Sequence, residues 1–269
     1  NAKTTGIALY SPTTATVDPT QVCHAVKTDL EAGGVRFLFG QGYLKRQGDA
    51  AIVTTGGRVL EAGLVINAAG LYADTVARDY GFSQNYTIIP VKGIYLKYTG
   101  RDKPIRTNIY PVPNLKNPFL GVHYTVTVDG TIKIGPTAIP AFWRQNYQGL
   151  EHFSLGELFE IIGWESRLFL GDNFGFRSLA LTELKKYDRS YFTGLATKMV
   201  QQIDTSGFNQ WSKPGIRAQL LNTVTRELVQ DFVVEGDNRS VHLLNAVSPA
   251  FTCSFPFAAW VVDRYIATA

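Results

Sequence analysis

Three stretches of the chain combine residue types that could bind an anion or a carboxylate. The first is the apolar run 64–66, which leads into Asn67-Ala68-Ala69-Gly70 and then into an expected helix. Small side chains let a ligand approach the backbone closely, and the N–H groups at a helix N-terminus attract an anion such as pyrophosphate. Tight packing of a strand against a helix accounts for the same residues equally well, so both interpretations stay open.

The second stretch, residues 214–218, places Arg217 among apolar, glycine and proline residues and away from other charges. A guanidinium in such surroundings could hold a carboxylate through two parallel hydrogen bonds. The alternative is a structural salt bridge, and the residues taken by themselves favour that alternative.

The third stretch is the expected start of the last helix. It comprises Asn245, Ala246, Val247, Ser248, Pro249, Ala250, Phe251 and Thr252. Backbone N–H groups at such a helix start could form a nest for an anion or a carbonyl oxygen. A capped helix without any ligand would have the same sequence.

Several well-known catalytic and metal-binding motifs are absent. The sequence contains no C-x-x-C, H-E-x-x-H, G-x-x-x-x-G-K-[ST] or G-x-S-x-G, and its four histidines lie far apart without metal-ligand spacing. A zinc site, a P-loop and a serine hydrolase therefore have no support, and we predict no metal. The pattern Gly40-Gln41-Gly42 is best interpreted as a surface turn, because Lys45 stands where a dinucleotide fingerprint needs its third glycine.

The elements that must position these stretches begin with alternating strands and helices. Asp18-Pro19 followed by Gln21 predicts a capped helix, which Gly33-Gly34 ends. Other apolar patterns predict strands at 6–10, 35–39 and 64–66, a hairpin of 51–54 with 58–61 around two glycines, and a helix at 71–80.

Beyond residue 85 the pattern becomes that of an antiparallel sheet followed by helices. We predict strands at 88–98, 108–112, 119–126 and 131–135, and helices at 155–170 and 187–202. Five aromatic residues of this region are expected in the core: Trp164, Phe169, Phe174, Phe176 and Phe192. A strand at 241–245 and a final helix from Ser248-Pro249 complete the chain, and Phe255, Ala259, Val262 and Ile266 form that helix's expected buried face.

These elements predict a mixed fold class, α/β plus α+β. Residues 1–84 and 214–269 would form a discontinuous α/β domain, and residues 85–213 an antiparallel-sheet domain inserted into it.

The composition restricts the class of protein. The 269 residues are 45% hydrophobic and 18% charged, which excludes a disordered chain. The longest apolar run, 255–262, is far shorter than the roughly 20 residues of a membrane span. The net charge of +4 comes from scattered Lys and Arg, so we predict a small-molecule substrate and no nucleic acid. Two cysteines and the lack of a recognisable signal peptide favour the cytoplasm.

A fourth block completes a resemblance to a known family. It comprises Tyr110-Pro111-Val112-Pro113, then Phe119-Leu120-Gly121-Val122-His123-Tyr124-Thr125, then Asp129-Gly130 and Gly135-Pro136-Thr137-Ala138. With the three stretches above, the chain resembles the L-2-hydroxyglutarate oxidase/dehydrogenase group of the D-amino-acid-oxidase-like FAD-dependent oxidoreductases. The resemblance extends from Tyr10 to the C-terminal helix.

The resemblance implies an FAD-binding α/β domain and an inserted substrate domain. In that family, residues matching Asn67, Ala68, Ala69 and Gly70 lie beside the FAD phosphates, and the arginine matching Arg217 faces the substrate carboxylate. The backbone at the positions of Ser248, Ala250, Phe251 and Thr252 is implied to approach the flavin ring and stabilise its reduced form.

His123 and Thr125 match family positions on the substrate-domain sheet that could face the flavin. Loss of a hydride from C2 of a 2-hydroxy acid requires that the hydroxyl proton is removed too, and histidine is the natural base near pH 7. His123 is therefore the candidate catalytic base and Thr125 a candidate substrate contact. A histidine that is hydrogen-bonded only for structural reasons is the alternative.

The chain departs from the family pattern at two internal positions, and its N-terminal part differs from that pattern too. Ala250 and Phe251 replace a glycine and a small residue, and Ile94 stands where the family often has an acidic residue. The family opens with a βαβ unit of about 30 or more residues that carries G-x-G-x-x-G, whereas the match begins at Tyr10, and the chain starts with Asn1 rather than Met. We expect a fragment that, alone, neither binds FAD nor turns over.

The sequence thus supports a fragment of an FAD-dependent oxidoreductase, the intact enzyme oxidising an L-2-hydroxy acid such as L-2-hydroxyglutarate by hydride transfer to flavin. One alternative is an amine or amino-acid oxidase of the same superfamily. Another is a non-catalytic binding module, which Ala250 and Phe251 would favour. The electron acceptor and a peripheral membrane contact stay open.

Overall fold

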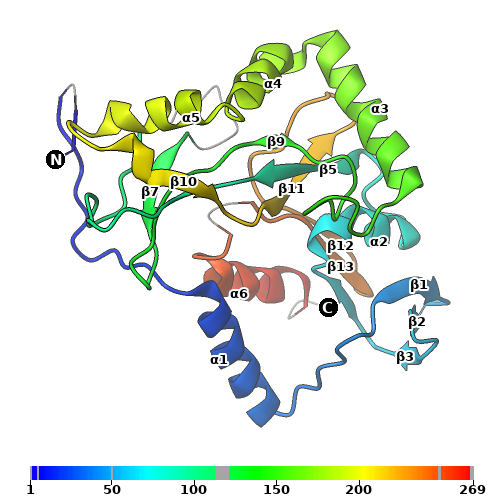
Figure 1. The fold of residues 1–269 in the computed structure, drawn as a ribbon. Coiled ribbons are helices and arrows are strands. Elements are labelled where there is room, and N and C mark those ends of the chain that lie inside the picture. Colours follow the sequence, from blue (N-terminus) through cyan, green and yellow to red (C-terminus); the bar gives the residue numbers. More distant parts are fainter. Residues whose placement is uncertain (1, 5, 50, 113–120, 248–249, 267–269) are drawn as a thin grey trace. The chain divides into compact units, whose positions relative to one another are not determined.

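The computed structural model describes residues 2–4, 6–49, 51–112, 121–247 and 250–266. It has the mixed α/β architecture with small sheets that the sequence predicts (Figure 1). The helices are α1 (Pro19–Ala32), α2 (Ala73–Asp79), α3 (Leu155–Gly171), α4 (Phe176–Lys185), α5 (Arg189–Ala196) and α6 (Ser254–Tyr265), with 3-10 turns η1 (Gly70–Tyr72), η2 (Asn173–Gly175), η3 (Thr197–Met199) and η4 (Thr205–Gly207). The strands are β1 (Tyr43–Gln47), β2 (Ala51–Thr54), β3 (Val59–Glu61), β4 (Val65–Asn67), β5 (Tyr86–Gly93), β6 (Leu96–Tyr98), β7 (His123–Val126), β8 (Ile132–Gly135), β9 (Ile139–Pro140), β10 (Phe208–Trp211), β11 (Gly215–Asn222), β12 (Val233–Gly236) and β13 (Ser240–Asn245).

The chain divides into two compact units. Unit 1 contains residues 1–37, 92–139 and 175–215, and unit 2 contains 38–91, 140–174 and 216–269. Unit 2 joins residues 38–84 to the C-terminal segment, and the predicted α/β domain, residues 1–84 with 214–269, joins the same two segments. The division into units differs by assigning the first 37 residues to unit 1 and residues 140–174 to unit 2. The predicted domain boundaries remain a prediction.

Unit 1 is built on an antiparallel sheet in the order β10-β6-β8-β7. On β7, Tyr124 points into a core in which it is fully buried, together with Leu96 and Phe208. Helix α5 covers this core with Phe192, whose ring stacks on Trp211 at a centroid distance of 5.7 Å. Because side chains alternate along a strand, the neighbours of Tyr124 on β7 face the other side of the sheet.

Unit 2 contains a sheet in the order β12-β13-β4, in which β13 and β4 run parallel and β12 is antiparallel. Helix α2 buries Ala73 and Ala77 in a core with Ile88, Leu220 and Leu244. The antiparallel sheet β1-β2-β3 contains the predicted hairpin. Its turn uses Gly57 at φ +75°, a left-handed conformation that favours glycine.

Helix α1 begins and ends where the sequence predicts. The Asp18 side chain accepts the Thr20 N–H at 2.8 Å, Pro19 is the first helical residue, and Gly33 follows the last turn. None of the residues of α1 is buried, however, so local capping rather than tertiary packing determines its bounds.

Several predicted strands are wrong. Residues 6–10 and 35–39 form no strand, and 108–112 contributes only an isolated bridge between Ile109 and Tyr124. Ile7 and Leu9 are fully exposed, and Phe39 is 73% exposed. The alternating apolar pattern is present there, but a strand also needs a neighbour to receive its backbone hydrogen bonds, and the described residues supply none.

Predictions about the core aromatic residues and about the last helix are also wrong. Phe169 and Phe174 are exposed rather than in the core, whereas Phe192 is buried as predicted. Helix α6 begins at Ser254 and not at Ser248, which lies outside the described residues. Its packed face is Phe257, Val261 and Tyr265, because Phe257 stacks on Phe232 and Val261 is buried, while the predicted Phe255 is 67% exposed.

None of the helices in the described part of the chain has the length and apolar character that a membrane crossing requires. Cys23 and Cys253 form no disulfide.

We expect Phe192→Ala to lower the free energy of unfolding of unit 1 by about 3–5 kcal/mol, because it removes a fully buried ring and leaves a cavity. Urea unfolding followed by tryptophan fluorescence measures the change, since the Phe192 ring contacts Trp211. Leu181→Ala is the matched control, because Leu181 lies in the same unit and is 54% exposed, so its truncation should change stability by less than about 0.5 kcal/mol. Equal losses in the two variants would contradict the assigned core.

Candidate functional site

Strand β4 ends at Asn67, and the small residues predicted to meet a phosphate follow at once. Ala68, Ala69 and Gly70 are exposed, so a ligand can reach their backbone. Gly70 has φ +56° and no heavy atom within 4 Å of the position that a Cβ would occupy. An exposed turn of small residues at the carboxyl end of a parallel strand fits an approaching phosphate group.

Asn67 holds this turn through its side chain. Its Nδ2 donates to the Ala73 carbonyl at 2.8 Å, and its Oδ1 accepts the Ala69 N–H at 3.1 Å. Asn67 itself is buried, with 4% exposure. The residue therefore belongs to the supporting structure of the turn rather than to its exposed surface.

The helix that follows differs from the predicted one. A 3-10 turn, η1, begins at Gly70 and precedes α2, and Asp74 occupies the first turn of α2. A carboxylate is already placed at that helix end, and its negative charge weakens the attraction of the helix N-terminus for an anion. The case for a phosphate rests on the exposed small residues alone.

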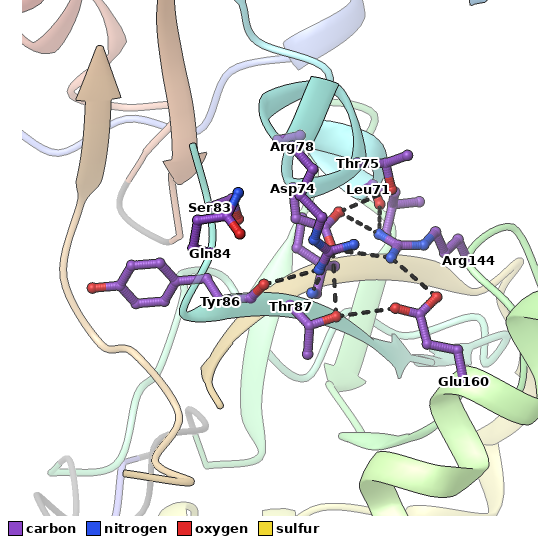
Figure 2. Close-up of polar contacts among 12 residues, drawn as sticks. Leu71, Asp74, Thr75, Arg78, Ser83, Gln84, Tyr86, Thr87, Arg144 and Glu160 are labelled. Atoms are coloured by element: carbon purple, nitrogen blue, oxygen red, sulfur yellow. Dashed lines mark hydrogen bonds and ion pairs between the residues drawn. The ribbon is translucent and has the colours of Figure 1, made fainter. Parts of the chain in front are cut away.

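Asp74 is the centre of a buried ion-pair network (Figure 2). Its two carboxylate oxygens accept hydrogen bonds from Arg144 at 2.6 and 3.0 Å, and both side chains are almost completely buried. Arg78 and the Ile88 N–H add further donors at 3.1 Å. Glu160 of α3 lies 3.6 Å from the Arg144 guanidinium and accepts the Thr87 hydroxyl at 3.2 Å.

The network fixes the turn from its other side. Arg144 donates to the Leu71 carbonyl in η1, directly after Gly70. Burial by itself would raise the pKa of Asp74, but the hydrogen bonds and charge of Arg144, with the charge of Arg78, outweigh it and lower that pKa. Asp74 is therefore charged at neutral pH, and the pair joins α2, η1 and the segment before α3.

His123 lies on β7 on the sheet face opposite the Tyr124 core. Its ring stacks on Tyr110 at 4.4 Å and meets the edge of Tyr95 at 6.2 Å. Its Nδ1 is 2.9 Å from the Gly121 carbonyl. A carbonyl oxygen only accepts, so Nδ1 carries a proton, and in the neutral ring Nε2 keeps its lone pair.

The surroundings of His123 favour this neutral form. Burial lowers the pKa of His123, and the hydrogen bond to Gly121 opposes that shift only in part. Thr125 lies two residues further along β7 and therefore on the same face, half-buried. The structure thus places His123 and Thr125 on one face of β7. Tyr95, from the segment where the family pattern changes, contributes to the surroundings of His123.

Arg217 lies on β11, in a different sheet of unit 2 from Asn67. It is half-buried, and desolvation lowers the pKa of its guanidinium. A positive charge placed in such surroundings is stabilised by a bound carboxylate. The alternative of a structural salt bridge stays open.

The predicted nest at the last helix is not formed as expected. Ala250, Phe251 and Thr252 lie in turns before α6, and Ser248 lies outside the described residues. The Ala250 N–H donates to the Val247 carbonyl at 2.9 Å, so it is not available to a ligand. Phe251 is 45% exposed and does not belong to a core.

Sequence reasoning missed the residues that support the turn, above all Asp74 and Arg144. Each makes its decisive contact with a residue distant in the sequence, and no local pattern indicates such a contact. The described residues contain no group of three or more His, Cys, Asp or Glu side chains placed to hold a metal ion.

Comparison with known proteins identifies the family. The sequence matches the family described as FAD dependent oxidoreductase (DAO) over residues 2–264, and the chain belongs to this family. The similarity confirms the resemblance found in the sequence.

Curated relatives are L-2-hydroxyglutarate dehydrogenases. The protein of Indibacter alkaliphilus is 31% identical over 96% of this chain and 66% of its own length. That of Escherichia coli is 30% identical over 95% of this chain and 61% of its own length, and the human mitochondrial protein is 35% identical over 79% and 46%. The chain thus spans about three fifths of the bacterial relatives.

Solved structures share the fold at low sequence identity. The L-α-glycerophosphate oxidase of Mycoplasma pneumoniae, with FAD bound, has a TM-score of 0.58 and 15% identity and covers 89% of this chain and 53% of its own. The glycerol-3-phosphate dehydrogenase of Bacillus halodurans, complexed with FAD, has a TM-score of 0.54 and 14% identity, with coverage of 90% and 42%.

We expect Asp74→Asn to lower the free energy of unfolding by about 3–5 kcal/mol, because it leaves the Arg144 charge buried without its partner. The folded-state pKa of Asp74 lies below 3.8, so its contribution is complete above that pH and is lost as the pH falls through the lower folded-state value. Urea unfolding at pH 7 and at pH 3 measures both effects.

Asp49→Asn is the matched control for Asp74→Asn. Asp49 also pairs with an arginine, Arg46, but its side chain is 66% exposed, so the change should be below about 1 kcal/mol. A loss as small for Asp74→Asn as for Asp49→Asn would show that the buried network contributes little.

Proposed function

We propose that this chain is part of an FAD-dependent oxidoreductase that oxidises an L-2-hydroxy acid, with L-2-hydroxyglutarate as the substrate. The observation that carries the proposal is the geometry of His123, a buried neutral histidine whose Nδ1–H donates to the Gly121 carbonyl and whose Nε2 keeps the lone pair of a base. The similarity to L-2-hydroxyglutarate dehydrogenases over nearly the whole chain supports the choice of substrate.

The exposed turn of Ala68, Ala69 and Gly70 would lie against the phosphates of FAD. The Ala69 N–H is bound to the Asn67 Oδ1 and sets the shape of the turn, so the other backbone N–H groups of the turn would contact the phosphates. The flavin, when bound, supplies the chemistry of accepting a hydride. Ala250, Phe251 and Thr252, with Ser248, would contribute to the surroundings of the ring. A glycine and a small residue of the family are replaced here by Ala250 and Phe251, the change that a non-catalytic binding module would favour.

The residues of this chain would bind the substrate and remove its proton. His123 Nε2 takes the proton of the C2 hydroxyl, because it is the unprotonated nitrogen of a neutral imidazole. Arg217 binds a carboxylate through its guanidinium, and Thr125 offers a hydroxyl on the same sheet face as His123. Location in the cytoplasm is part of the same proposal, supported by the similarity to bacterial L-2-hydroxyglutarate dehydrogenases.

The complete gene product, supplied with FAD and kept anaerobic, should lose the absorbance of oxidised flavin at about 450 nm when L-2-hydroxyglutarate is added, because the substrate reduces the flavin. D-2-hydroxyglutarate is the matched control. Bleaching only by glycine, sarcosine or proline would favour an amine or amino-acid oxidase. A protein that stays colourless with FAD would favour a non-catalytic binding module and contradict the proposal.

We expect His123→Gln to lower kcat of the FAD-loaded complete gene product by about 10²–10⁴-fold, the usual contribution of a general base. Because burial lowers the pKa of His123, the acid limb of the kcat/KM profile should lie below pH 6.5, and it should vanish in the variant. His24→Asn is the control, since His24 is exposed on α1. A His123→Gln enzyme with the wild-type profile would assign the base to another residue.

A further inference from the structure

A buried histidine of β13 lies next to the residue that supports the 68–70 turn. His242 and Asn67 are paired in the register of the parallel strands β13 and β4, although 175 residues separate them in the chain. His242 is completely buried and Asn67 is 4% exposed. The His242 Nδ1 lies 3.1 Å from the Asn67 Nδ2. This contact is part of no motif that the sequence displays.

The direction of this hydrogen bond follows from the other contacts of Asn67. Its Oδ1 accepts the Ala69 N–H, and its Nδ2 donates to the Ala73 carbonyl, so the orientation of the amide is determined. The second proton of Nδ2 then points to His242, and Nδ1 must accept it. His242 is therefore a neutral imidazole with its proton on Nε2.

The surroundings of His242 leave the acceptor role as its one polar function in the described part of the chain. The rings of Tyr80 and Phe82 pack against it at 5.1 and 5.0 Å, and His242 Nε2 has no hydrogen-bond partner there. Burial lowers the pKa of His242 to about 4, against an opposing effect of Asp237. A buried donor without a hydrogen-bond partner is unfavourable, so the Nε2–H of His242, unpaired among the described residues, lowers the free energy of unfolding.

We propose that His242 is a positioning residue for the 68–70 turn: it fixes the amide of Asn67, and Asn67 in turn fixes the Ala69 N–H and the carbonyl of Ala73. The consequence for FAD rests on the proposed function, in which this turn meets the cofactor phosphates. Without the acceptor on His242, the Asn67 amide keeps its contacts with Ala69 and Ala73 but loses the third of its hydrogen bonds, so it holds the turn less firmly in the geometry that would receive a phosphate.

Two substitutions separate the acceptor from the bulk of the ring. His242→Phe keeps a ring of similar size and removes the acceptor. His242→Asn places its amide oxygen close to the position of Nδ1 and restores an acceptor. Any loss caused by Phe and reversed by Asn therefore reports the hydrogen bond to Asn67, because Asn fills the space less well than Phe does.

The first test uses the 269-residue chain and needs no cofactor. Amide hydrogen exchange at Ala69 should become about three- to tenfold faster in His242→Phe, the change expected for one net hydrogen bond, and return to within about twofold of wild type in His242→Asn. The Leu244 amide on the same strand is the internal reference and should change by less than about twofold. Unchanged exchange at Ala69 in His242→Phe, or equal acceleration at Leu244, would overturn the proposal.

A second measurement covers the case in which His242→Phe does not fold. The ¹⁵N chemical shifts of the wild-type imidazole at pH 7 distinguish its two neutral forms. A protonated Nε2 with a bare Nδ1 is the expected result. A protonated Nδ1 or a charged ring would overturn the proposal, since neither could accept from Asn67.

The third measurement concerns FAD and uses the complete gene product. The FAD dissociation constant, followed by quenching of flavin fluorescence, should rise about three- to tenfold in His242→Phe and recover in His242→Asn. An unchanged constant, with faster exchange at Ala69, would overturn the link to the cofactor. Failure of the wild-type protein to bind FAD would contradict the proposed function instead, and the exchange result would still decide the role of His242.

Discussion

The arrangement of unit 2 depends on the charge pair of Asp74 and Arg144. Two ionic side chains with 0% and 2% exposure are tolerated only where every charge and donor is satisfied, because an unpaired charge in the interior is far more costly than the pair gains. Arg144 can meet Asp74 only if the segment before α3 lies against α2. The same guanidinium then binds the Leu71 carbonyl, so one ion pair fixes a helix, a connecting segment and the end of the 68–70 turn.

The conformation of the 68–70 turn is therefore determined by the Asn67 and Arg144 side chains that hydrogen-bond to its two ends, rather than by its own side chains. Ala68, Ala69 and Gly70 contribute little besides exposed backbone. The Asn67 amide holds the turn at its start and Arg144 holds it at its end. A binding surface of small residues gains affinity when its geometry is set before the ligand arrives, because little conformational entropy remains to be lost.

Local features of the fold could be predicted from the sequence, and long-range ones could not. The cap at Asp18, the hairpin turn at Gly57 and the strand before Asn67 are encoded in adjacent residues, and the structure contains all three. The pairing of Asp74 with Arg144 joins residues 70 positions apart. A single sequence does not show which distant residues pair. Asp74 and Arg144 were therefore not predicted as supports of the 68–70 turn, whereas the small residues of that turn could be singled out.

His123 shows how one strand can serve a core and a site at once. Tyr124 is buried on one face of β7, and the alternation of the strand necessarily directs His123 to the other face, against Tyr95 and Tyr110. Those rings exclude water and thereby lower the pKa of the imidazole, while the Gly121 carbonyl selects which nitrogen keeps the proton. Packing of the core thus determines both the orientation and the protonation state of the candidate base.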